Sequence, residues 1–234
     1  MEKINIAQYI DHTLLKADAT MDDITVLCKE AIEYDFYAVC VNACFVALAK
    51  NILQHSNVKI ATTIGFPLGA MHTNAKVLEA KQAVEDGSDE IDMVMNIGLL
   101  KSGMDEEVMR DMKAVKESVG KEVVVKVIFE NCLLNEDEKR KACKLAIQAD
   151  VDFVKTSTGF TTGSVAAHGA TKEDLVLMLD EVKGSGLKVK AAGGVKDYQT
   201  AETYIRLGID RIGTSSGIAL ITDQTTEQTT ANTY

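Results

Sequence analysis

The run DEIDMVMN at residues 89–96 and the run EVVVKVI at residues 122–128 decide the fold class. Both are short and rich in β-branched or apolar residues, as β-strands are. The segment between them carries an apolar stripe at helical spacing, formed by Val108, Met112, Val115 and Val119. A stripe of this kind packs against a sheet, while the opposite, charged face of the helix meets water. Strand, amphipathic helix and strand in this order predict a βαβ unit with parallel strands.

The same alternation of strand-like and helix-like segments extends from this unit toward both ends of the chain. Eight apolar runs begin near Ile10, Tyr37, Val58, Asp89, Glu122, Val151, Leu187 and Ile209. Successive runs start 21 to 36 residues apart, which leaves room for one helix and two loops each time. No linker rich in proline, glycine or serine interrupts the series. We therefore predict a single-domain α/β protein, a closed (β/α)8 (TIM) barrel over residues 1–221, rather than an open sheet in two domains.

Residues at the ends of the helical segments agree with this division. Thr20, Asn135 and Thr171 each precede an acidic first turn, as helix N-caps do. Gly120 and Gly208 follow helical stretches at the position of a C-terminal stop. Residues 222–234 are rich in threonine and glutamine, and we predict a flexible C-terminal tail there.

The composition excludes several classes of function. Of the 234 residues, 46% are hydrophobic and 26% are charged, which suits a globular protein with a sizeable core. The longest uncharged, apolar-rich run, residues 36–49, has 14 residues, whereas a membrane span needs about 20. The net charge of −10 argues against binding to nucleic acid, and it requires a locally positive pocket for any anionic ligand.

The cysteines and the N-terminal residues indicate a compartment. The five cysteines form no CxxC pair, and the first residues, MEKIN, lack the basic and apolar blocks of a secretory signal. We therefore expect free thiols and a cytoplasmic location. The acidic surface is compatible with a monomer or a homodimer.

Polar residues at alternate strand positions indicate where the chemistry lies. One face of each barrel strand meets the helices, and the other meets the interior. In the first run quoted above, the apolar residues alternate with Asp92, and the same alternation turns three lysines of the following strands inward. These lysines are Lys126, Lys155 and Lys190, and they converge with Asp92 on one cavity. A register shifted by one residue would instead make them solvated strand ends, with three charges facing the helices.

Convergence of three ammonium groups changes their proton affinity. One carboxylate, Asp92, cannot neutralise three lysines. Two unit charges about 4 Å apart, at an effective dielectric constant of about 20, repel by ~4 kcal/mol, or roughly three pKa units. Burial acts in the same direction. At least one amine would then be neutral near pH 7.5 and able to attack a carbonyl, so we hypothesise a Schiff-base lysine. The residues alone do not rank Lys126, Lys155 and Lys190 as the nucleophile.

Two glycine-rich segments follow the seventh and eighth runs. AAGGVK spans residues 191–196, and GTSSG spans residues 213–217, directly before a segment that is able to start a short helix. The corresponding loops of a barrel often hold a phosphate on backbone N–H groups, and glycine permits close approach. We therefore predict a phosphate site, and the alternative interpretation is a pair of tight turns.

Other candidate sites have less support. The four histidines are scattered and no metal-binding motif is present, so we expect neither a metal nor a cofactor. Cys40 and Cys44 are interpreted as a strand residue and a helix residue rather than as metal ligands. Asp11 and Thr13 alternate on the first strand, where they would reach the barrel mouth or serve as cap and turn residues. A serine nucleophile lacks the GxSxG elbow.

Seven segments together carry a resemblance to a known family. They are IDHTLL at 10–15, GFPLGA at 65–70, DEIDMVMNIG at 89–98, VKVIFE at 125–130, VKTSTGF at 154–160, KAAGGV at 190–195 and RIGTSSG at 211–217. On these segments the chain resembles the deoxyribose-phosphate aldolases, a family of class I, metal-independent (β/α)8 aldolases, from Ile10 to about Ile221. The resemblance implies reversible cleavage of 2-deoxy-D-ribose 5-phosphate into D-glyceraldehyde 3-phosphate and acetaldehyde.

The same resemblance implies roles for particular residues. Lys155 would form the Schiff base, Lys190 beside it would lower its pKa, and Asp92 would relay protons. The residues expected to hold the phosphate are Gly193, Gly194, Gly213, Ser215 and Ser216. The residues expected next to the reacting groups are Lys126, Asp11, Thr13 and Cys40.

Two features depart from the family pattern. Residues 164–168, SVAAH, form a short insertion on the catalytic face, which bears on substrate scope and loop mobility. Phe160 stands where some relatives carry a lysine, and we therefore leave it out of the phosphate site.

The tail ending at Tyr234 either folds over the barrel mouth or forms a disordered end.

Two other functions share some of these features. A phosphosugar isomerase or epimerase would use the phosphate loops with a carboxylate or histidine as proton shuttle, but it leaves the interior lysines unexplained. A non-catalytic phosphosugar-binding protein would need the glycine loops and nothing from Lys155.

Overall fold

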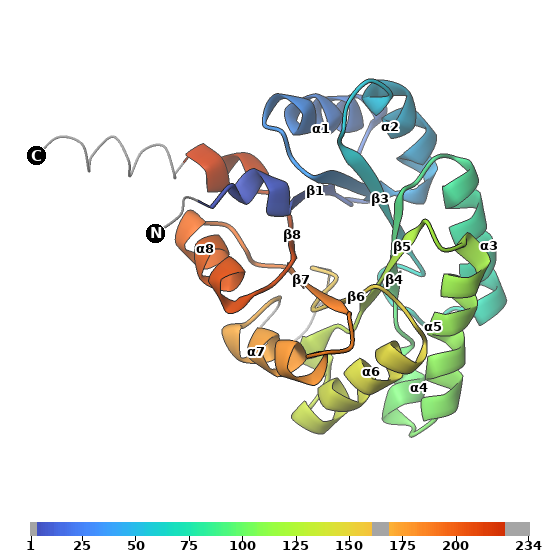
Figure 1. Cartoon of the computed structure of the whole chain (residues 1–234). Coiled ribbons are helices and arrows are strands. Elements are labelled where there is room, and N and C mark those ends of the chain that lie inside the picture. The colour runs from blue at the N-terminus through green and yellow to red at the C-terminus, as the bar shows by residue number, and fades with distance from the viewer. Residues whose placement is uncertain (1–3, 161–168, 223–234) are drawn as a thin grey trace, which may run out of the picture.

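Eight parallel strands close into a barrel in the computed structural model, which describes residues 4–160 and 169–222. Viewed along the barrel axis, the strands form an inner ring and the helices lie outside it (Figure 1). Each strand pairs with its neighbour in sequence, and the first pairs with the last. The predicted closed (β/α)8 barrel is therefore confirmed. The insertion at 164–168, and the tail from residue 223 to Tyr234, lie outside the described residues.

All eight strands begin within two residues of their predicted starts. They are β1 (Ile10–Leu14), β2 (Ala38–Asn42), β3 (Lys59–Ile64), β4 (Glu90–Val94), β5 (Val124–Ile128), β6 (Phe153–Lys155), β7 (Lys188–Ala192) and β8 (Arg211–Thr214). Parallel strands of this kind are buried on both faces, which explains why their sequences read as short, nearly continuous apolar runs.

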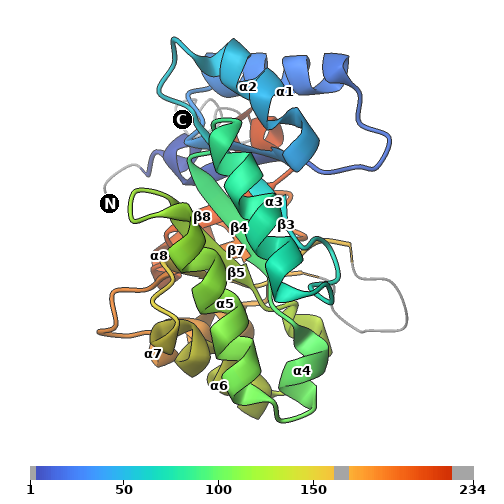
Figure 2. The same cartoon turned by 90° about the vertical axis from the view of Figure 1, so that its right-hand side faces the viewer.

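Helices fill the connections between the strands. They are α1 (Met21–Glu33), α2 (Val46–Leu53), α3 (Thr73–Glu85), α4 (Ile97–Lys101), α5 (Asp105–Val119), α6 (Glu136–Gln148), α7 (Lys172–Glu181) and α8 (Tyr198–Leu207). Short 3-10 helices lie at Ile6–Tyr9 (η1), Ala43–Phe45 (η2) and Asn131–Leu133 (η3), and residues 217–222 are helical after β8. Figure 2 shows α3, α5 and α6 side by side along one flank of the barrel.

The predicted caps define several of these helix ends. The side chains of Thr20 and Asn135 accept the backbone N–H of the third helical residue, and both complete a capping box. Thr171 accepts the N–H of Asp174, whose own carboxylate binds Lys139 at 2.6 Å instead of returning to the cap. Gly208 ends α8 in the left-handed conformation.

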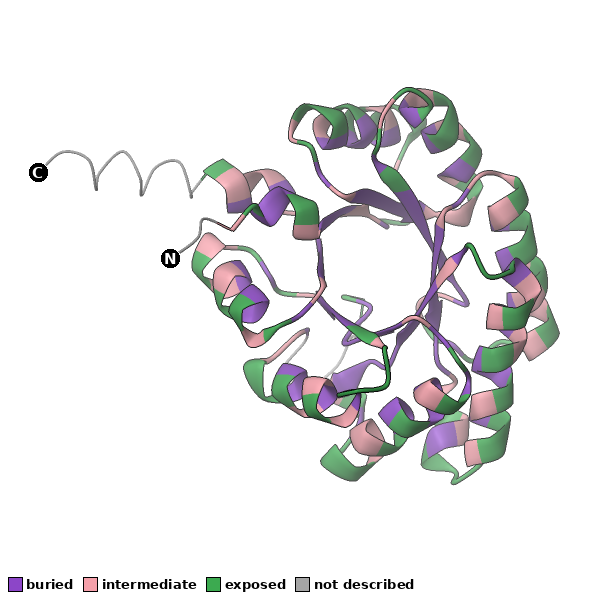
Figure 3. Cartoon of the chain, in the orientation of Figure 1, coloured by how far each residue is buried: buried purple, intermediate pink, exposed green. Residues whose placement is uncertain are grey.

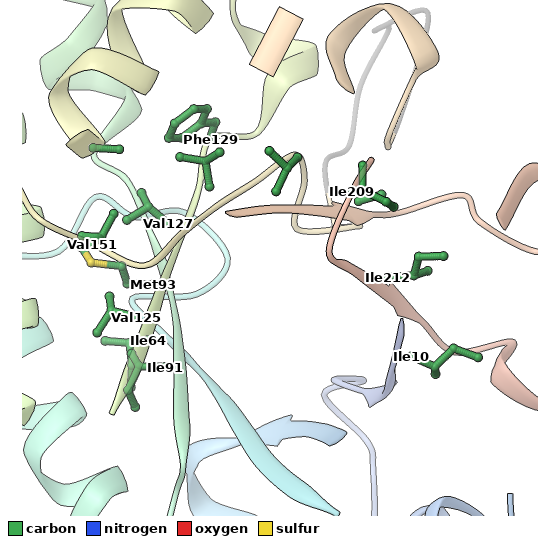
Figure 4. Packing of buried hydrophobic residues seen from close by; sticks show 14 of the residues in the cluster. Ile10, Ile64, Ile91, Met93, Val125, Val127, Phe129, Val151, Ile209 and Ile212 are labelled. Atoms are coloured by element: carbon green, nitrogen blue, oxygen red, sulfur yellow. The ribbon is translucent and has the colours of Figure 1, made fainter. Parts of the chain in front are cut away.

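The main hydrophobic core lies between the strand ring and the helices. Figure 4 shows Ile91 and Met93 of β4 among its members, with Val125 and Val127 of β5. The stripe predicted on α5 is buried against them, and Figure 3 shows the same division on every helix, with buried residues toward the barrel and exposed residues away from it. Among the described residues, no helix combines the length and the apolar character that crossing a membrane requires.

Strand register fixes which polar residues meet inside the barrel. Asp92 of β4 lies opposite Lys126 of β5, and Lys155 of β6 lies opposite Lys190 of β7. All four side chains are buried in the interior. The predicted register is therefore confirmed, and the alternative that makes these lysines solvated strand ends is wrong.

Candidate active site

Asp92 lies at the centre of the buried charges. Its Oδ1 accepts a hydrogen bond from Lys126 Nζ at 2.7 Å. Its Oδ2 accepts hydrogen bonds from Lys155 Nζ and from Lys190 Nζ, each at 2.8 Å. The structure thus brings together the four residues that strand alternation turned inward.

Three further ionic groups lie in the same interior. Asp11 was expected next to the reacting groups and Glu90 shares a strand face with Asp92, whereas sequence reasoning missed Arg211. Asp11 of β1 pairs with Lys190, Glu90 of β4 lies 2.5 Å from Lys126, and Arg211 of β8 binds both carboxylates. Asp92 therefore shares the lysines with two further carboxylates. The alternation of inward and outward residues along β8 could have placed Arg211 in the interior. Arg211 lies on the same strand face as Gly213, which lines the cavity.

Burial and neighbouring charges set the proton affinity of each lysine differently. Burial lowers the pKa of Lys155 below its ordinary value; the Asp92 carboxylate opposes this shift, and the Lys190 ammonium adds to it. Burial also lowers the pKa of Lys190, but Asp11 and Asp92 outweigh it, and the net effect is a raised pKa. The pKa of Lys126 is likewise raised, because Asp92 and Glu90 outweigh its burial. Lys155 is thus the amine among the three that loses its proton most readily.

The carboxylates respond in the opposite way. Burial alone would raise the pKa of Asp92, but the ammonium groups of Lys126, Lys155 and Lys190 hold it well below its usual range. Burial also acts to raise the pKa of Asp11, and Arg211 and Lys190 lower it to about 2. Both aspartates are therefore ionised at neutral pH and available as hydrogen-bond acceptors.

A cavity of about 390 Å³ opens beside Lys155 at the carboxyl ends of the strands. Its lining contains all five residues predicted to hold a phosphate, namely Gly193, Gly194, Gly213, Ser215 and Ser216. Gly193 has φ +79°, and a Cβ there would lie 2.9 Å from Gly169 Cα. Only glycine fits this close approach of two loops.

Other residues of the lining were not among those predicted to hold the phosphate. Lys16 follows β1 and Lys196 follows β7, and both side chains are exposed and line the cavity. Phe160 also lines it and packs edge-on against Phe66 at 5.2 Å between ring centroids. Phe160 was left out of the predicted phosphate site, and the structure shows that it borders the same cavity. The available signals were the position of Lys16 shortly after β1 and the place of Lys196 at the end of the glycine-rich segment AAGGVK.

The residues expected next to the reacting groups occupy different depths. Thr13 lines the cavity, and its hydroxyl donates to the carbonyl oxygen of Asp11 at 2.9 Å. Asp11 itself does not reach the mouth, because β1 places it one layer deeper, between Lys190 and Arg211. Cys40 of β2 is fully buried; burial raises the pKa of its thiol, and the nearby Asp92 carboxylate acts in the same direction.

The described residues contain no group of three or more histidine, cysteine, aspartate or glutamate side chains placed to hold a metal ion. The groups that the structure brings together beside the cavity are the amine of Lys155 and the carboxylate of Asp92. A buried lysine with a lowered pKa, at the catalytic end of a closed barrel, defines a (β/α)8 enzyme suited to covalent carbonyl chemistry.

Comparison with known proteins gives the family. The sequence model of the DeoC/LacD family aldolases matches residues 5–219. The chain belongs to this family of aldolases.

Close relatives cover nearly the whole chain. A protein of Geobacillus sp. (strain WCH70) named deoxyribose-phosphate aldolase is 52% identical over 221 residues, which cover 94% of this chain and 96% of that protein. A protein of Thermococcus gammatolerans with the same name is 54% identical over 224 residues, covering 94% of this chain and 97% of that protein.

Solved structures agree with the fold. The aldolase QR15 superposes with a TM-score of 0.89 at 40% identity, over 97% of this chain and 99% of its own. The deoxyribose phosphate aldolase of Aeropyrum pernix, described as a tetramer, gives a TM-score of 0.86 at 30% identity, over 95% of this chain and 92% of its own.

Proposed function

We propose that this aldolase reversibly cleaves 2-deoxy-D-ribose 5-phosphate into D-glyceraldehyde 3-phosphate and acetaldehyde through an imine on Lys155. The observation that carries the proposal is the position of Lys155. Its amine has a lowered pKa, it is hydrogen-bonded to Asp92, and it borders the cavity that both glycine loops line. The names of the close relatives support this choice of substrate.

The chemistry begins with the neutral amine of Lys155. Its nitrogen attacks the aldehyde carbon of the open-chain sugar, and loss of water with uptake of one proton gives an iminium ion. Removal of the C3 hydroxyl proton then breaks the C2–C3 bond, releases D-glyceraldehyde 3-phosphate and leaves an enamine on Lys155. Protonation of the enamine at C2 and addition of water release acetaldehyde and restore the amine.

Asp92 and Lys190 support these steps. The Asp92 carboxylate lies 2.8 Å from the amine, where it moves protons during imine formation and hydrolysis. Lys190 remains charged beside it and disfavours protonation of Lys155.

The phosphate binds at the far end of the cavity. Gly193, Gly194, Gly213, Ser215 and Ser216 offer backbone and hydroxyl donors there, and the ammonium groups of Lys16 and Lys196 supply positive charge. On a chain of net charge −10, these loops provide the locally positive pocket that an anionic substrate needs. Their contribution is to hold the sugar so that its aldehyde reaches Lys155.

Trapping of the imine tests the proposal. Reduction with borohydride in the presence of acetaldehyde should attach a two-carbon group to Lys155, detected by peptide mass spectrometry. Lys155→Arg keeps the positive charge and should abolish both the adduct and turnover, while Lys121→Arg, at an exposed lysine, should change neither. An isomerase, an epimerase or a binding protein predicts no adduct, and turnover by Lys155→Arg would contradict the assignment.

Location and assembly follow as part of the proposal. All five cysteines are free thiols, which supports a reducing, cytoplasmic compartment. The acidic surface is compatible with a monomer or a homodimer, which light scattering of the purified protein would distinguish.

A further inference from the structure

Six of the buried charged groups form a closed ring in which the sign of the charge alternates. Around the ring the groups are Asp92, Lys126, Glu90, Arg211, Asp11 and Lys190. The ion pairs from Asp92 to Lys126, Lys126 to Glu90 and Glu90 to Arg211 measure 2.7, 2.5 and 2.9 Å. Arg211 Nε donates to Asp11 at 2.8 Å, Lys190 pairs with Asp11, and Lys190 returns to Asp92 at 2.8 Å.

Lys155 stands outside this ring. The ring contains three carboxylates and three cations, so its formal charge is zero when every member is ionised. Among the described residues, Lys155 forms an ion pair with Asp92 alone. The same carboxylate also pairs with two lysines of the ring, Lys126 and Lys190. A proton on Lys155 therefore adds an unbalanced charge to a buried cluster, which is costly.

Arg211 links the two halves of the ring at the end away from the cavity. Its guanidinium binds both Asp11 and Glu90, and it lies over the ring of Tyr37 at 3.5 Å from the centroid. Neither Arg211 nor Glu90 lines the cavity beside Lys155. A planar guanidinium suits this bridge, because it presents several donors in a fixed fork.

We propose that Arg211 and Glu90 are positioning residues whose opposite charges, acting through the ring, set the pH at which the amine of Lys155 becomes neutral. The inference rests on the proposed role of Lys155 as the attacking amine. The groups that face this amine are Asp92 from β4, Lys190 from β7 and the Cys40 thiol from β2, with Lys126 of β5 on the other oxygen of Asp92. Arg211 and Glu90 act on it through Asp11, Lys190, Lys126 and Asp92.

Two substitutions of opposite sign test the proposal. On the acidic side of a pH profile, the rate at which Lys155 reacts falls as its amine becomes protonated, and we call this part of the profile the acid limb. Arg211→Met removes a positive charge and should move the acid limb to higher pH. Glu90→Gln removes a negative charge at nearly constant shape and should move the same limb to lower pH. For a charge on the order of 10 Å away and an effective dielectric constant of about 20, each shift is about one pH unit. The double variant restores charge balance and should return the limb toward the wild-type position.

The measurement is the rate of acetaldehyde adduct formation on Lys155, trapped with cyanoborohydride across a pH series and followed by mass spectrometry. Arg211→Lys keeps the charge and should lie closer to the wild type than Arg211→Met does. Shifts of the same sign in both single variants, or unchanged limbs, would overturn the proposal, because loss of packing alone does not reverse direction with charge. If Arg211→Met does not fold, Glu90→Gln and the double variant decide the question. Absence of any adduct in the wild type would instead reject the proposed function.

Discussion

Lys155 and Lys190 are the same residue type on adjacent strands, and their surroundings shift their pKa values in opposite directions. Lys190 has two carboxylate partners, Asp11 and Asp92, whereas Lys155 has one and shares it. Because burial costs both ammonium groups solvation, the number of carboxylates decides which of them keeps its proton. The division into an amine with a lowered pKa and one with a raised pKa therefore arises from the partners of each lysine.

Lys190→Met tests this division. Removing the neighbouring ammonium relieves repulsion and leaves Asp92 freer to stabilise a proton on Lys155, so the pKa of Lys155 should rise. The reaction needs the neutral amine. As the pH is lowered, the cleavage rate should therefore begin to fall at a higher pH than in the wild type. A pH–rate profile checks this shift. Lys188→Met, at an exposed lysine on the same strand, is the matched control and should leave the profile unchanged.

At the scale of elements, the loops after β7 and β8 line the end of the cavity where we propose that the phosphate binds. Gly193 and Gly169 bring two loops together, and the N–H of Ala170 donates to the carbonyl oxygen of Gly193 at 3.1 Å. The backbone at Gly193 is left-handed, with φ +79°, so that both its conformation and its surroundings select glycine.

Gly193→Ala should weaken substrate binding beyond its effect on stability. A Cβ at this position lies 2.9 Å from backbone, and the loop must move to admit it. Gly120→Ala is the matched control, because Gly120 has φ +82° and a Cβ there meets nothing within 4 Å. Both variants should lose about 1–2 kcal/mol of stability from left-handed backbone strain. Only Gly193→Ala should raise the KM for the phosphosugar, measured with steady-state kinetics, and equal KM values in the two variants would contradict the phosphate assignment.

Strand order and strand faces could be predicted from the sequence, because a period of two residues separates inward from outward positions. This pattern placed Asp92, Lys126 and Lys155 in the interior before any coordinates. It could not give depth along the barrel axis, which depends on the stagger between strands. Asp11 was therefore expected either at the mouth or in a cap or turn. Its contact with Arg211 was not predicted, because 200 residues of sequence separate the two.

Loops were harder to predict than strands for a different reason. Lys16, Phe160 and Lys196 belong to three loops that border one cavity only because β1, β6, β7 and β8 lie in one arc of the closed barrel. Side-chain periodicity carries no information about which way a loop turns after its strand ends.

At the scale of the whole molecule, the buried ion pairs tie stability to pH. The folded protein holds the pKa of Asp11 at about 2, against an ordinary value of 3.8. Because the folded pKa is the lower one, this carboxylate contributes stability that is fully present above about pH 4 and is lost as the pH falls through about 2. The contribution is about 2 kcal/mol, and Asp92, whose pKa is also lowered, acts in the same direction.

The free energy of unfolding should therefore fall between about pH 4 and pH 2, as measured by urea denaturation at each pH. Asp11→Asn should flatten part of this fall, because the variant has no carboxylate at this position to protonate. The same variant should lose about 3–5 kcal/mol at neutral pH, since Lys190 and Arg211 lose a buried partner. Asp180→Asn, at an exposed site, should leave the pH dependence as it is. An equally steep fall in Asp11→Asn would contradict the account.

The interior charges are divided by sign along the chain. Asp11, Glu90 and Asp92 lie on β1 and β4, in the first four strands, whereas the three lysines and Arg211 lie on the last four. Each half-barrel alone would thus concentrate like charges on its concave face and repel itself, while the two halves attract one another. In the closed barrel, an ion pair between Asp11 and Arg211 joins β1 to β8 in addition to their strand pairing. The arrangement that prepares one amine for reaction also penalises stopping halfway in assembly, so intermediates with a single folded half should be scarce.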